Sequence, residues 1–429
     1  MFILNILYLH THDTGRFIEP YGFPVPMPNV SALADESAVF RNAFCTAPTC
    51  SPSRVGMLTG TMPNCAGMYG LAHRGFRMND PTEHLAYFLK SHGYETVLCG
   101  VQHEGAARAM GYERVYNHRY DGGSFTETDR CNAEHAVSYL REGKTKPFFL
   151  SYGMFNTHRP FPAHGDAVNP DRLPVPPCVQ DTAANRSDMA DFARALTEVD
   201  ENVGKVLAAL RESGLYDDTL ILYTTDHGIA FPNMKCTLYD GGIGVNLMLK
   251  YPGNPSAGKT LDMLVSHLDV FPTICELLGL EPKPGLQGKS LVPALEKGEN
   301  IRDEIFAEVT YHVVYEPQRC IRTDRYKLIR RYSDDLVTIP CHLDGGCAAK
   351  KDLLAADWQN SVHPREELYD LLYDPSERHN RVGDAVYAEV YKELSERLDR
   401  HLAEIGDVIY RYPEGVPAPN GADISPIDN

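Results

Sequence analysis

Over the first three hundred residues, short apolar runs alternate with longer stretches in which apolar residues recur every three or four positions. Short apolar runs are typical of buried strands, and the three-to-four spacing is typical of helices with one buried face. We therefore predict an α/β fold with a large, mostly parallel sheet sandwiched by helices. The runs expected to form strands are 3–9, 95–99, 148–152, 219–225 and 245–249.

The clearest helix is predicted over 186–213, where one apolar stripe repeats at helical spacing and Gly214 follows as a stop signal. The stripe consists of Met189, Phe192, Leu196, Val199, Val203, Val206 and Leu210. Another helix is expected over 82–92, directly before Gly93. Each of these helices is expected to pack its apolar face on the sheet.

The pattern changes after Pro282. A connection rich in Pro and Gly leads to alternating segments such as 326–330, and a helix is predicted over 385–405. From about residue 410 the chain is rich in Pro, and we expect it to be irregular.

These changes predict two units. The larger is an α/β domain over 1–300, which we expect to be catalytic. The smaller is a C-terminal α+β subdomain over 301–429 that packs on it.

The charge balance narrows the possible partners. The chain has 41 Lys and Arg against 58 Asp and Glu, a formal net charge of -17, and it has no long basic run. Nucleic acid and acidic lipid are therefore poor candidate partners, although the local field of a pocket can still attract an anion. Composition alone leaves the oligomeric state open.

Cysteine usage and the first residues bear on the compartment. The eleven cysteines are scattered and form no CxxC pair, which favours free thiols in a reducing compartment. The apolar run within 1–9 has neither a basic region before it nor a small-residue cleavage site after it, so we interpret it as a strand. No apolar run is long enough to cross a membrane. We expect a cytoplasmic protein, or a periplasmic or secreted one if a signal has been trimmed.

Polar side chains follow two of the predicted strands. His12-Asp13 comes after the first strand, and Asp226-His227 comes after the strand 219–225. Ligands collect at the carboxyl ends of strands in open α/β sheets, so the two pairs are expected to converge on one cation. Carboxylates favour hard metals, and imidazoles favour Mn, Fe or Zn. The alternative for each aspartate is a helix cap.

A third candidate lies in 48–60, which reads PTCSPSRVGMLTG. Pro52 suits the first turn of a helix, which puts Cys50 at the helix N-terminus and Arg54 one turn further on. Unpaired backbone N–H groups and the helix dipole favour an anion there. The alternative is an ordinary buried cysteine.

Cys50-Ser51-Pro52-Ser53-Arg54, followed by Leu58-Thr59-Gly60, resembles the signature of the type I, formylglycine-dependent sulfatases of the alkaline phosphatase superfamily. The resemblance extends from residue 5 to about 380 and implies an alkaline phosphatase-like fold. Further matching pieces are Pro28-Asn29, Leu33-Ala34, Asp226-His227-Gly228, Lys235, Leu238-Tyr239-Asp240-Gly241-Gly242, Asp269, Pro272-Thr273, Glu367-Leu368-Tyr369-Asp370 and Asp374-Pro375.

The resemblance implies that a maturation enzyme oxidises Cys50 to formylglycine. One hydroxyl of the hydrated aldehyde attacks sulfur, and the other expels sulfate as the aldehyde re-forms. It also implies one divalent metal ion beside residue 50, with Asp13, Asp226 and His227 as ligands. Arg54 is then expected to stabilise the modified residue. Lys235 is expected to contact the sulfate or the leaving-group oxygen.

His103 and His158 match family histidines near the nucleophile and the sulfate, so one is expected to act as a base and one as an acid. Without the matched context, either would more simply be a structural histidine.

The chain departs from the family pattern in two places. His12-Asp13 stands where most sulfatases have paired aspartates, and Gly100-Val101-Gln102-His103 stands where they have Gly-Lys-Trp-His. If His12 is a ligand, the expected metal shifts from Ca toward Mn. Alternatively His12 does not bind the metal and instead orients the ligand Asp13. Either Arg74 or Arg159 is expected to replace the missing lysine.

Some segments, such as 67–71, are similar to the heparan N-sulfatases, or N-sulfoglucosamine sulfohydrolases. Two segments are candidates to face a sugar, one around Arg74 and one ending at His312, and each has a surface-loop or core alternative. The resemblance therefore implies a hydrolase of a sulfate ester or sulfamate, on a sulfated sugar such as N-sulfoglucosamine. The alternatives are a phosphonate monoester or phosphodiester hydrolase and a catalytically silent protein that binds sulfated glycans.

Overall fold

The computed structural model describes residues 4–118 and 123–426. Within them the large sheet has nine strands, in the order β4-β3-β5-β1-β6-β8-β2-β7, with β9 also pairing with β2. The strands are β1 (Asn5–Thr11), β2 (Ala38–Phe44), β3 (Glu95–Gly100), β4 (Arg114–Tyr116), β5 (Phe148–Gly153), β6 (Thr219–Thr225), β7 (Gly244–Val245), β8 (Leu247–Lys250) and β9 (Lys259–Ser266).

The large sheet is mostly parallel. Strands β4, β3, β5, β1 and β6 run parallel to one another, and β9 runs parallel to β2. Only β8 and β7 pair antiparallel with their neighbours. Every residue of β1 and β6 is buried, as expected for central strands covered on both faces.

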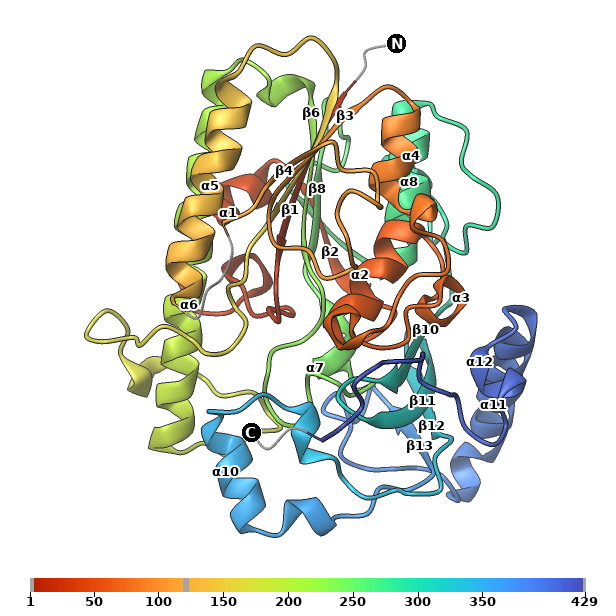
Figure 1. Ribbon diagram of the computed structural model, residues 1–429. Coiled ribbons are helices and arrows are strands. Elements are labelled where there is room, and N and C mark those ends of the chain that lie inside the picture. The colour runs from red at the N-terminus through yellow and green to blue at the C-terminus, as the bar shows by residue number, and fades with distance from the viewer. Residues whose placement is uncertain (1–3, 119–122, 427–429) are drawn as a thin grey trace.

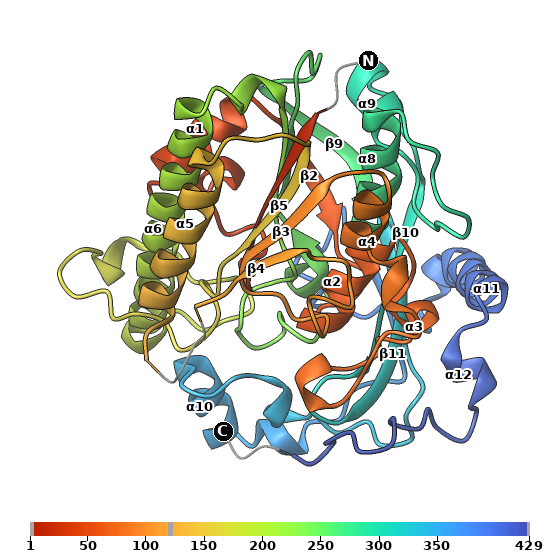
Figure 2. The same ribbon diagram turned by 45° about the horizontal axis from the view of Figure 1, so that its top comes forward.

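Helices cover both faces of the sheet (Figure 1). One face packs against α1 (Pro28–Asp35), α5 (Phe125–Arg141) and α6 (Ala183–Glu212). The other packs against α2 (Cys50–Thr59), α4 (Leu85–Ser91) and α8 (Val270–Leu278), and the view of Figure 2 separates the two layers. Short helices α3 (Pro63–Ala66), α7 (Asp240–Ile243) and α9 (Val292–Lys297) lie in the connections.

A second, antiparallel sheet lies in the C-terminal part, in the order β10-β11-β12-β13. Its strands are β10 (Glu304–Tyr311), β11 (Tyr315–Thr323), β12 (Tyr326–Arg331) and β13 (Glu366–Asp370). The helices of this part are α10 (Ala348–Ala355), α11 (Ala388–Glu404) and α12 (Val408–Arg411). Ile305, Ala307 and Val309 join the core of the large sheet, while α11 covers the opposite face of the small sheet. One continuous apolar core therefore connects the two sheets.

The expected fold class is confirmed. The strand predicted at 219–225 matches β6, and the strands predicted at 95–99 and 148–152 each end one residue early. The first predicted strand begins at Ile3, which lies outside the described residues; β1 starts at Asn5 and runs to Thr11. The strand predicted at 245–249 is divided between β7 and β8.

The predicted helices also form, with small shifts at their ends. The long helix α6 starts three residues early because the Thr182 hydroxyl caps it by accepting from the Asn185 N–H. Of the stretch predicted at 82–92, only Leu85–Ser91 is α-helical. Helix α2 ends before Gly60, whose φ of +66° only glycine adopts at little cost. In 4–118 and 123–426, no helix combines the length and the apolar character that crossing a bilayer requires.

A buried ion pair holds α12 against the small sheet. Arg319 Nε and Nη2 donate to the two carboxylate oxygens of Asp407, each at 2.7 Å, and both side chains are at most 1% exposed. The third guanidinium nitrogen of Arg319, Nη1, donates to the backbone carbonyls of Val309 and Gln318. Removing one charge of such a pair leaves the other buried without compensation.

We therefore predict that Asp407→Asn lowers the free energy of unfolding by about 3–5 kcal/mol, measured by urea denaturation. The matched control is Glu212→Gln, because Glu212 pairs with Arg141 at 3.0 Å but both side chains are about 60% exposed. The control should cost less than about 1 kcal/mol. Equal losses in the two variants would contradict the prediction.

Candidate active site

Five segments that follow strands of the large sheet meet at one edge. His12 and Asp13 follow β1, Asp226 and His227 follow β6, and Cys50 begins α2 after β2. His103 lies after β3 and His158 after β5. The parallel order of β3, β5, β1 and β6 places four of these segments at the same edge, as expected for an open α/β sheet.

Asp226 is the most heavily bonded carboxylate of this group. Its Oδ1 accepts from the backbone N–H of Asp13 at 2.8 Å and of His227 at 3.0 Å. Its Oδ2 lies 2.9 Å from Arg54 Nη2 and 3.2 Å from His12 Nδ1. Burial alone raises the pKa of Asp226, but His227, Arg54 and His12 together hold it well below its usual value. Asp226 is therefore an anion in the folded protein.

Arg54 is fixed from three directions. Besides Asp226, its Nη2 donates to the Thr11 carbonyl at 2.9 Å, and its Nη1 donates to His10 Nδ1 at 2.7 Å. Since Nδ1 of His10 accepts, its Nε2 carries the proton and donates to the Ser151 hydroxyl at 3.1 Å. Burial and the Arg54 charge lower the pKa of His10 well below its usual value, so this ring stays neutral.

The two carboxylate oxygens of Asp13 differ in their contacts: one accepts a hydrogen bond, and the other has no partner among the described residues. Its Oδ2 accepts from Lys235 Nζ at 2.8 Å. Its buried Oδ1 has no hydrogen-bond partner among the described residues and lies 3.4 Å from His227 Nε2. The backbone of Asp13 has φ +48°, an uncommon conformation that its N–H bond to Asp226 helps to hold. The carboxylate therefore points an unpaired oxygen at the other ligand-type groups.

Cys50 is the first residue of α2 and is 3% exposed. Its Sγ lies 3.4 Å from His227 Nε2. His227 Nδ1 donates to the Gly228 carbonyl at 3.0 Å, so Nε2 presents its lone pair to Cys50 and Asp13. Burial raises the pKa of the Cys50 thiol well above its usual value, so the thiol is protonated.

These side chains can hold a metal ion. One ligand atom from each of His12, Asp13, Cys50 and Asp226 lies within 4.8 Å of each of the others. Asp13 Oδ1 and His12 Nε2 are buried and have no hydrogen-bond partner among the described residues, which is costly unless a ligand satisfies them. Two carboxylates beside imidazoles suit a divalent cation. The donor set thus fits the metal that the sequence resemblance implies.

A cavity of about 280 Å³ opens beside Cys50. Its walls include Arg74, Lys235 and Asp344 and the six histidines His12, His73, His103, His158, His312 and His342. Burial, and then the Arg54 charge, lower the pKa of His103 to about 3, so its ring is neutral near pH 7. A neutral imidazole can accept a proton.

Lys235 and His158 lie side by side in this cavity. Lys235 Nζ is 3.3 Å from His158 Nε2, and His158 Nδ1 donates to the Arg159 carbonyl at 2.5 Å, so Nε2 is the accepting nitrogen. Burial alone lowers the pKa of Lys235, but Asp13 and Asp344 outweigh it and hold the pKa well above its usual value. Lys235 is therefore a fixed cation at the cavity wall.

Asp344 is a cavity residue that the sequence did not indicate. Its Oδ2 accepts from Lys235 Nζ at 2.6 Å, and its Oδ1 lies 3.9 Å from His158 Nε2. The only local signal is Asp344 before Gly345 and Gly346, which is typical of a turn. No periodic pattern connects this turn with the strand ends of the large sheet.

The structure separates the two arginines considered as replacements for the missing lysine. Arg74 lines the cavity, and its Nε and Nη2 donate to the backbone carbonyls of Asp423 and Ser425, each at 2.7 Å. Arg159 instead makes a two-pronged pair with Asp188, with both distances 2.7 Å, and is not among the cavity residues. His312 lines the cavity, and its Nδ1 has no partner in the described part of the chain.

Solved structures share this fold over nearly the whole chain. A protein in complex with its substrate D-glucosamine-2-N,6-O-disulfate superposes with a TM-score of 0.74, at 21% identity, covering 94% of this chain and 98% of that one. The phosphonate monoester hydrolase of Agrobacterium radiobacter gives a TM-score of 0.75, also at 21% identity, covering 97% and 100%. The fold is thus that of the alkaline phosphatase-like hydrolases.

Sequence comparison gives the family. Residues 5–280 match the family model described as Sulfatase, and residues 231–339 match the model N-sulphoglucosamine sulphohydrolase, C-terminal. Human N-sulphoglucosamine sulphohydrolase is 28% identical over 470 residues, covering 96% of this chain and 92% of that protein. An ulvan-active sulfatase of Formosa agariphila is 26% identical, covering 94% and 75%. The chain belongs to the sulfatase family and is an enzyme of the sulfuric ester or sulfamate hydrolase class.

The unpaired ligand atoms predict metal-dependent stability. Mn²⁺ or Ca²⁺ at about 100 times its dissociation constant should stabilise the folded protein by about 2.7 kcal/mol, seen as a rise in Tm. Asp13→Asn should abolish most of that rise, because it removes the charge of the oxygen left unpaired. Asp191→Asn, which alters a carboxylate paired with His164 outside the cavity, is the control and should keep it. A rise that survives in Asp13→Asn would place the ion elsewhere.

Proposed function

We propose that this protein is a metal-dependent sulfatase that hydrolyses a sulfate ester or sulfamate of a sulfated sugar such as N-sulfoglucosamine. The nucleophile in this proposal comes from Cys50 after its conversion to formylglycine. The observation that carries the proposal is the position of Cys50, at the start of α2, with its sulfur within 4.8 Å of a ligand atom of each of His12, Asp13 and Asp226, beside a cavity lined by Lys235. The similarity to human N-sulphoglucosamine sulphohydrolase over nearly the full length supports the substrate class.

Residues at the strand ends would hold the metal. Asp13, Asp226, His227 and His12 surround residue 50, and the nitrogen donors favour Mn over Ca. When present, the hydrated aldehyde supplies a hydroxyl nucleophile, and the divalent ion supplies a Lewis acid that polarises the sulfate. Arg54 keeps Asp226 ionised and in place and thereby fixes the helix that carries residue 50.

The remaining residues handle the substrate and its protons. Lys235 offers a cation to a sulfate oxygen, while His158 Nε2, 3.3 Å from Lys235 Nζ, can relay a proton to the leaving group. We assign His103, which lines the cavity together with Cys50, to accept a proton from the nucleophile. A departing amine or alkoxide needs a proton, so an acid and a base in the same cavity as residue 50 suit both esters and sulfamates.

Substrate binding draws on both parts of the chain. We propose that residues 1–300 form the catalytic domain and that 301–429 form a subdomain that completes the cavity through His312 and Asp344. Arg74 is the better replacement for the missing lysine, because it lines the cavity whereas Arg159 is bound by Asp188. A cavity of about 280 Å³ suits a mono- or oligosaccharide end rather than an extended flat surface.

The nucleophile is tested on protein from the native host. Peptide mass spectrometry across Cys50 should show the loss of mass that accompanies replacement of the thiol by an aldehyde. Cys50→Ala should lower kcat/KM on glucosamine N-sulfate by about 10³-fold or more, because it removes the nucleophile. Cys131→Ser, at a partly exposed cysteine outside the cavity, is the control. Full activity in Cys50→Ala would overturn the mechanism.

A second candidate is a phosphonate monoester or phosphodiester hydrolase of the same superfamily. The fold match to the phosphonate monoester hydrolase and the similarity to the multifunctional alkaline phosphatase superfamily protein of Trinickia caryophylli, 25% identical over 92% of this chain, favour including it. Asp226-His227 also resembles the Asp-His pair of those hydrolases.

We predict that purified, metal-loaded protein turns over chromogenic sulfates faster than matched phosphodiesters and phosphonates, because the human sulphohydrolase and the ulvan-active sulfatase are similar to nearly all of this chain, at 28% and 26% identity. The comparison of kcat/KM across the three esters is the measurement. Faster phosphodiester turnover would favour the second candidate. Retained glycan binding with no turnover by converted protein would instead indicate a binding protein.

A further inference from the structure

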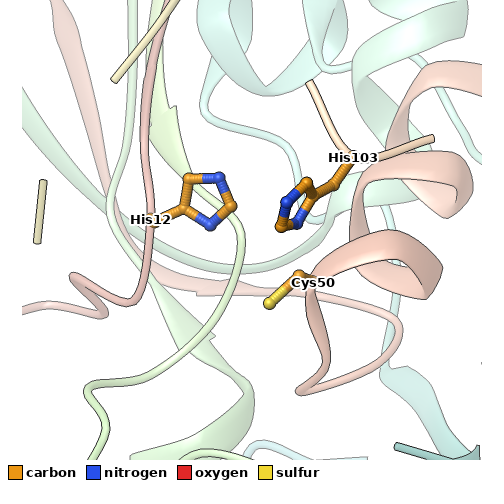
Figure 3. A group of neighbouring side chains, drawn as sticks. All are labelled: His12, Cys50 and His103. Atoms are coloured by element: carbon orange, nitrogen blue, oxygen red, sulfur yellow. The ribbon is translucent and has the colours of Figure 1, made fainter. Parts of the chain in front are cut away.

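Three side chains from separate segments gather around one point (Figure 3). Cys50 begins α2, His12 follows β1, and His103 lies after β3. One ligand atom of each, the Cys50 sulfur and a ring nitrogen of each histidine, lies within 4.8 Å of the others. Since His103 is not among the ligand-type groups around Asp13 and Asp226, this trio is a second, overlapping set of donors.

One ring nitrogen of His12 and one of His103 are available to bind a ligand. His12 Nε2 and His103 Nδ1 are buried and have no hydrogen-bond partner in 4–118 and 123–426. The rings meet edge to face, with centroids 4.9 Å apart and planes at 78°, and these nitrogens form no hydrogen bond between them. Buried polar nitrogens without partners are uncommon because their desolvation is costly, and a ligand would remove that cost.

The donor chemistry points to a thiophilic metal. Zn²⁺ binds both Cys sulfur and His nitrogen, and a zinc site with three protein ligands keeps its fourth position open. Zn–S and Zn–N bonds of about 2.3 and 2.1 Å place tetrahedral donors about 3.3–3.7 Å apart. The donor separations of up to 4.8 Å therefore need to shorten by only about 1 Å, within the reach of side-chain rotation.

The two donor sets share His12 and Cys50 but differ in hardness. Asp13 and Asp226 supply oxygen to the first set, whereas His103 supplies nitrogen to the second. Hard ions such as Ca²⁺ or Mn²⁺ prefer the carboxylates, and Zn²⁺ prefers the set that contains the thiolate. Whether residue 50 carries a sulfur atom therefore determines which of the two donor sets binds a metal ion.

We propose that the unconverted, thiol form of the protein binds Zn²⁺ or another thiophilic divalent ion through Cys50 Sγ, His12 and His103. The thiol proton leaves to solvent when the sulfur binds. This zinc site does not depend on the proposed sulfatase mechanism. One consequence does rest on it: conversion of Cys50 to formylglycine removes the sulfur, abolishes the zinc site and leaves the oxygen-rich set.

The test uses full-length protein whose Cys50 is a thiol by mass spectrometry, with Co²⁺ as the spectroscopic probe. Binding should produce a thiolate-to-cobalt charge-transfer band in the near ultraviolet and strong visible absorption of a four-coordinate ion. Zn²⁺ alone should displace Co²⁺ and remove both features. Cys50→Ala should abolish the charge-transfer band.

His103→Gln and His12→Gln should each weaken Co²⁺ binding by about 10- to 100-fold or more, the scale seen when even a supporting residue of a metal site is lost. His73→Gln is the matched control, because its exposed ring also lines the cavity, with its centroid 5.7 Å from that of His103, but lies outside the donor set. Asp13→Asn should keep the band, which separates this site from the oxygen-rich one.

A band that persists in Cys50→Ala would assign the sulfur to one of the other ten cysteines and overturn the proposal. Unchanged affinity in both histidine variants would overturn it as well. A measurement on the wild-type chain guards against misfolded variants: Zn²⁺ should slow alkylation of Cys50 but not of Cys341, a partly exposed cysteine of the same cavity. Equal alkylation of Cys50 with and without Zn²⁺ would contradict the site.

Discussion

The buried pair between Arg54 and Asp226 connects the two halves of the site. Arg54 belongs to α2 and Asp226 follows β6, and both side chains are at most 1% exposed. Neither charge could remain buried without the other, so the helix that carries Cys50 has to sit against the central strand ends. The other functional groups take their positions from this contact, since Asp226 also receives the Asp13 and His227 N–H groups.

The sequence predicted the parts of the site that lie directly after strands. Asp13 and Asp226 follow short apolar runs that predict strands, and the parallel pairing of these strands brings the two residues together. Asp344 and the contact of Arg74 with Asp423 could not be predicted in this way. They depend on how an irregular turn and an irregular tail pack against residues of the large-sheet part, and neither segment carries a periodic pattern.

The same limit explains the outcome for Arg159. The sequence left Arg74 and Arg159 as equal candidates to replace the missing lysine. Asp188, on the long helix α6, binds the Arg159 guanidinium through both of its prongs. Asp188 lies 29 residues from Arg159 in sequence, so their contact depends on tertiary packing and cannot be predicted from the local sequence pattern. The net charge of -17 also could not predict that the cavity wall would carry two cations, Lys235 and Arg74.

Hydrogen bonds from Arg74 to Asp423 and Ser425 connect the C-terminal segment with the cavity. The Arg74 side chain reaches carbonyls about 350 positions away, and the Asp423 N–H donates back to the Arg74 carbonyl at 2.8 Å. Ala422 also packs against the backbone of Gly75, where a Cβ would approach it to 2.8 Å. The position of a cationic cavity residue therefore depends on backbone carbonyls far from it in the sequence, whereas the ligand-type groups depend on the strand ends. Substitutions within 422–425 can shift Arg74 and leave the contacts of Asp13 and Asp226 in place.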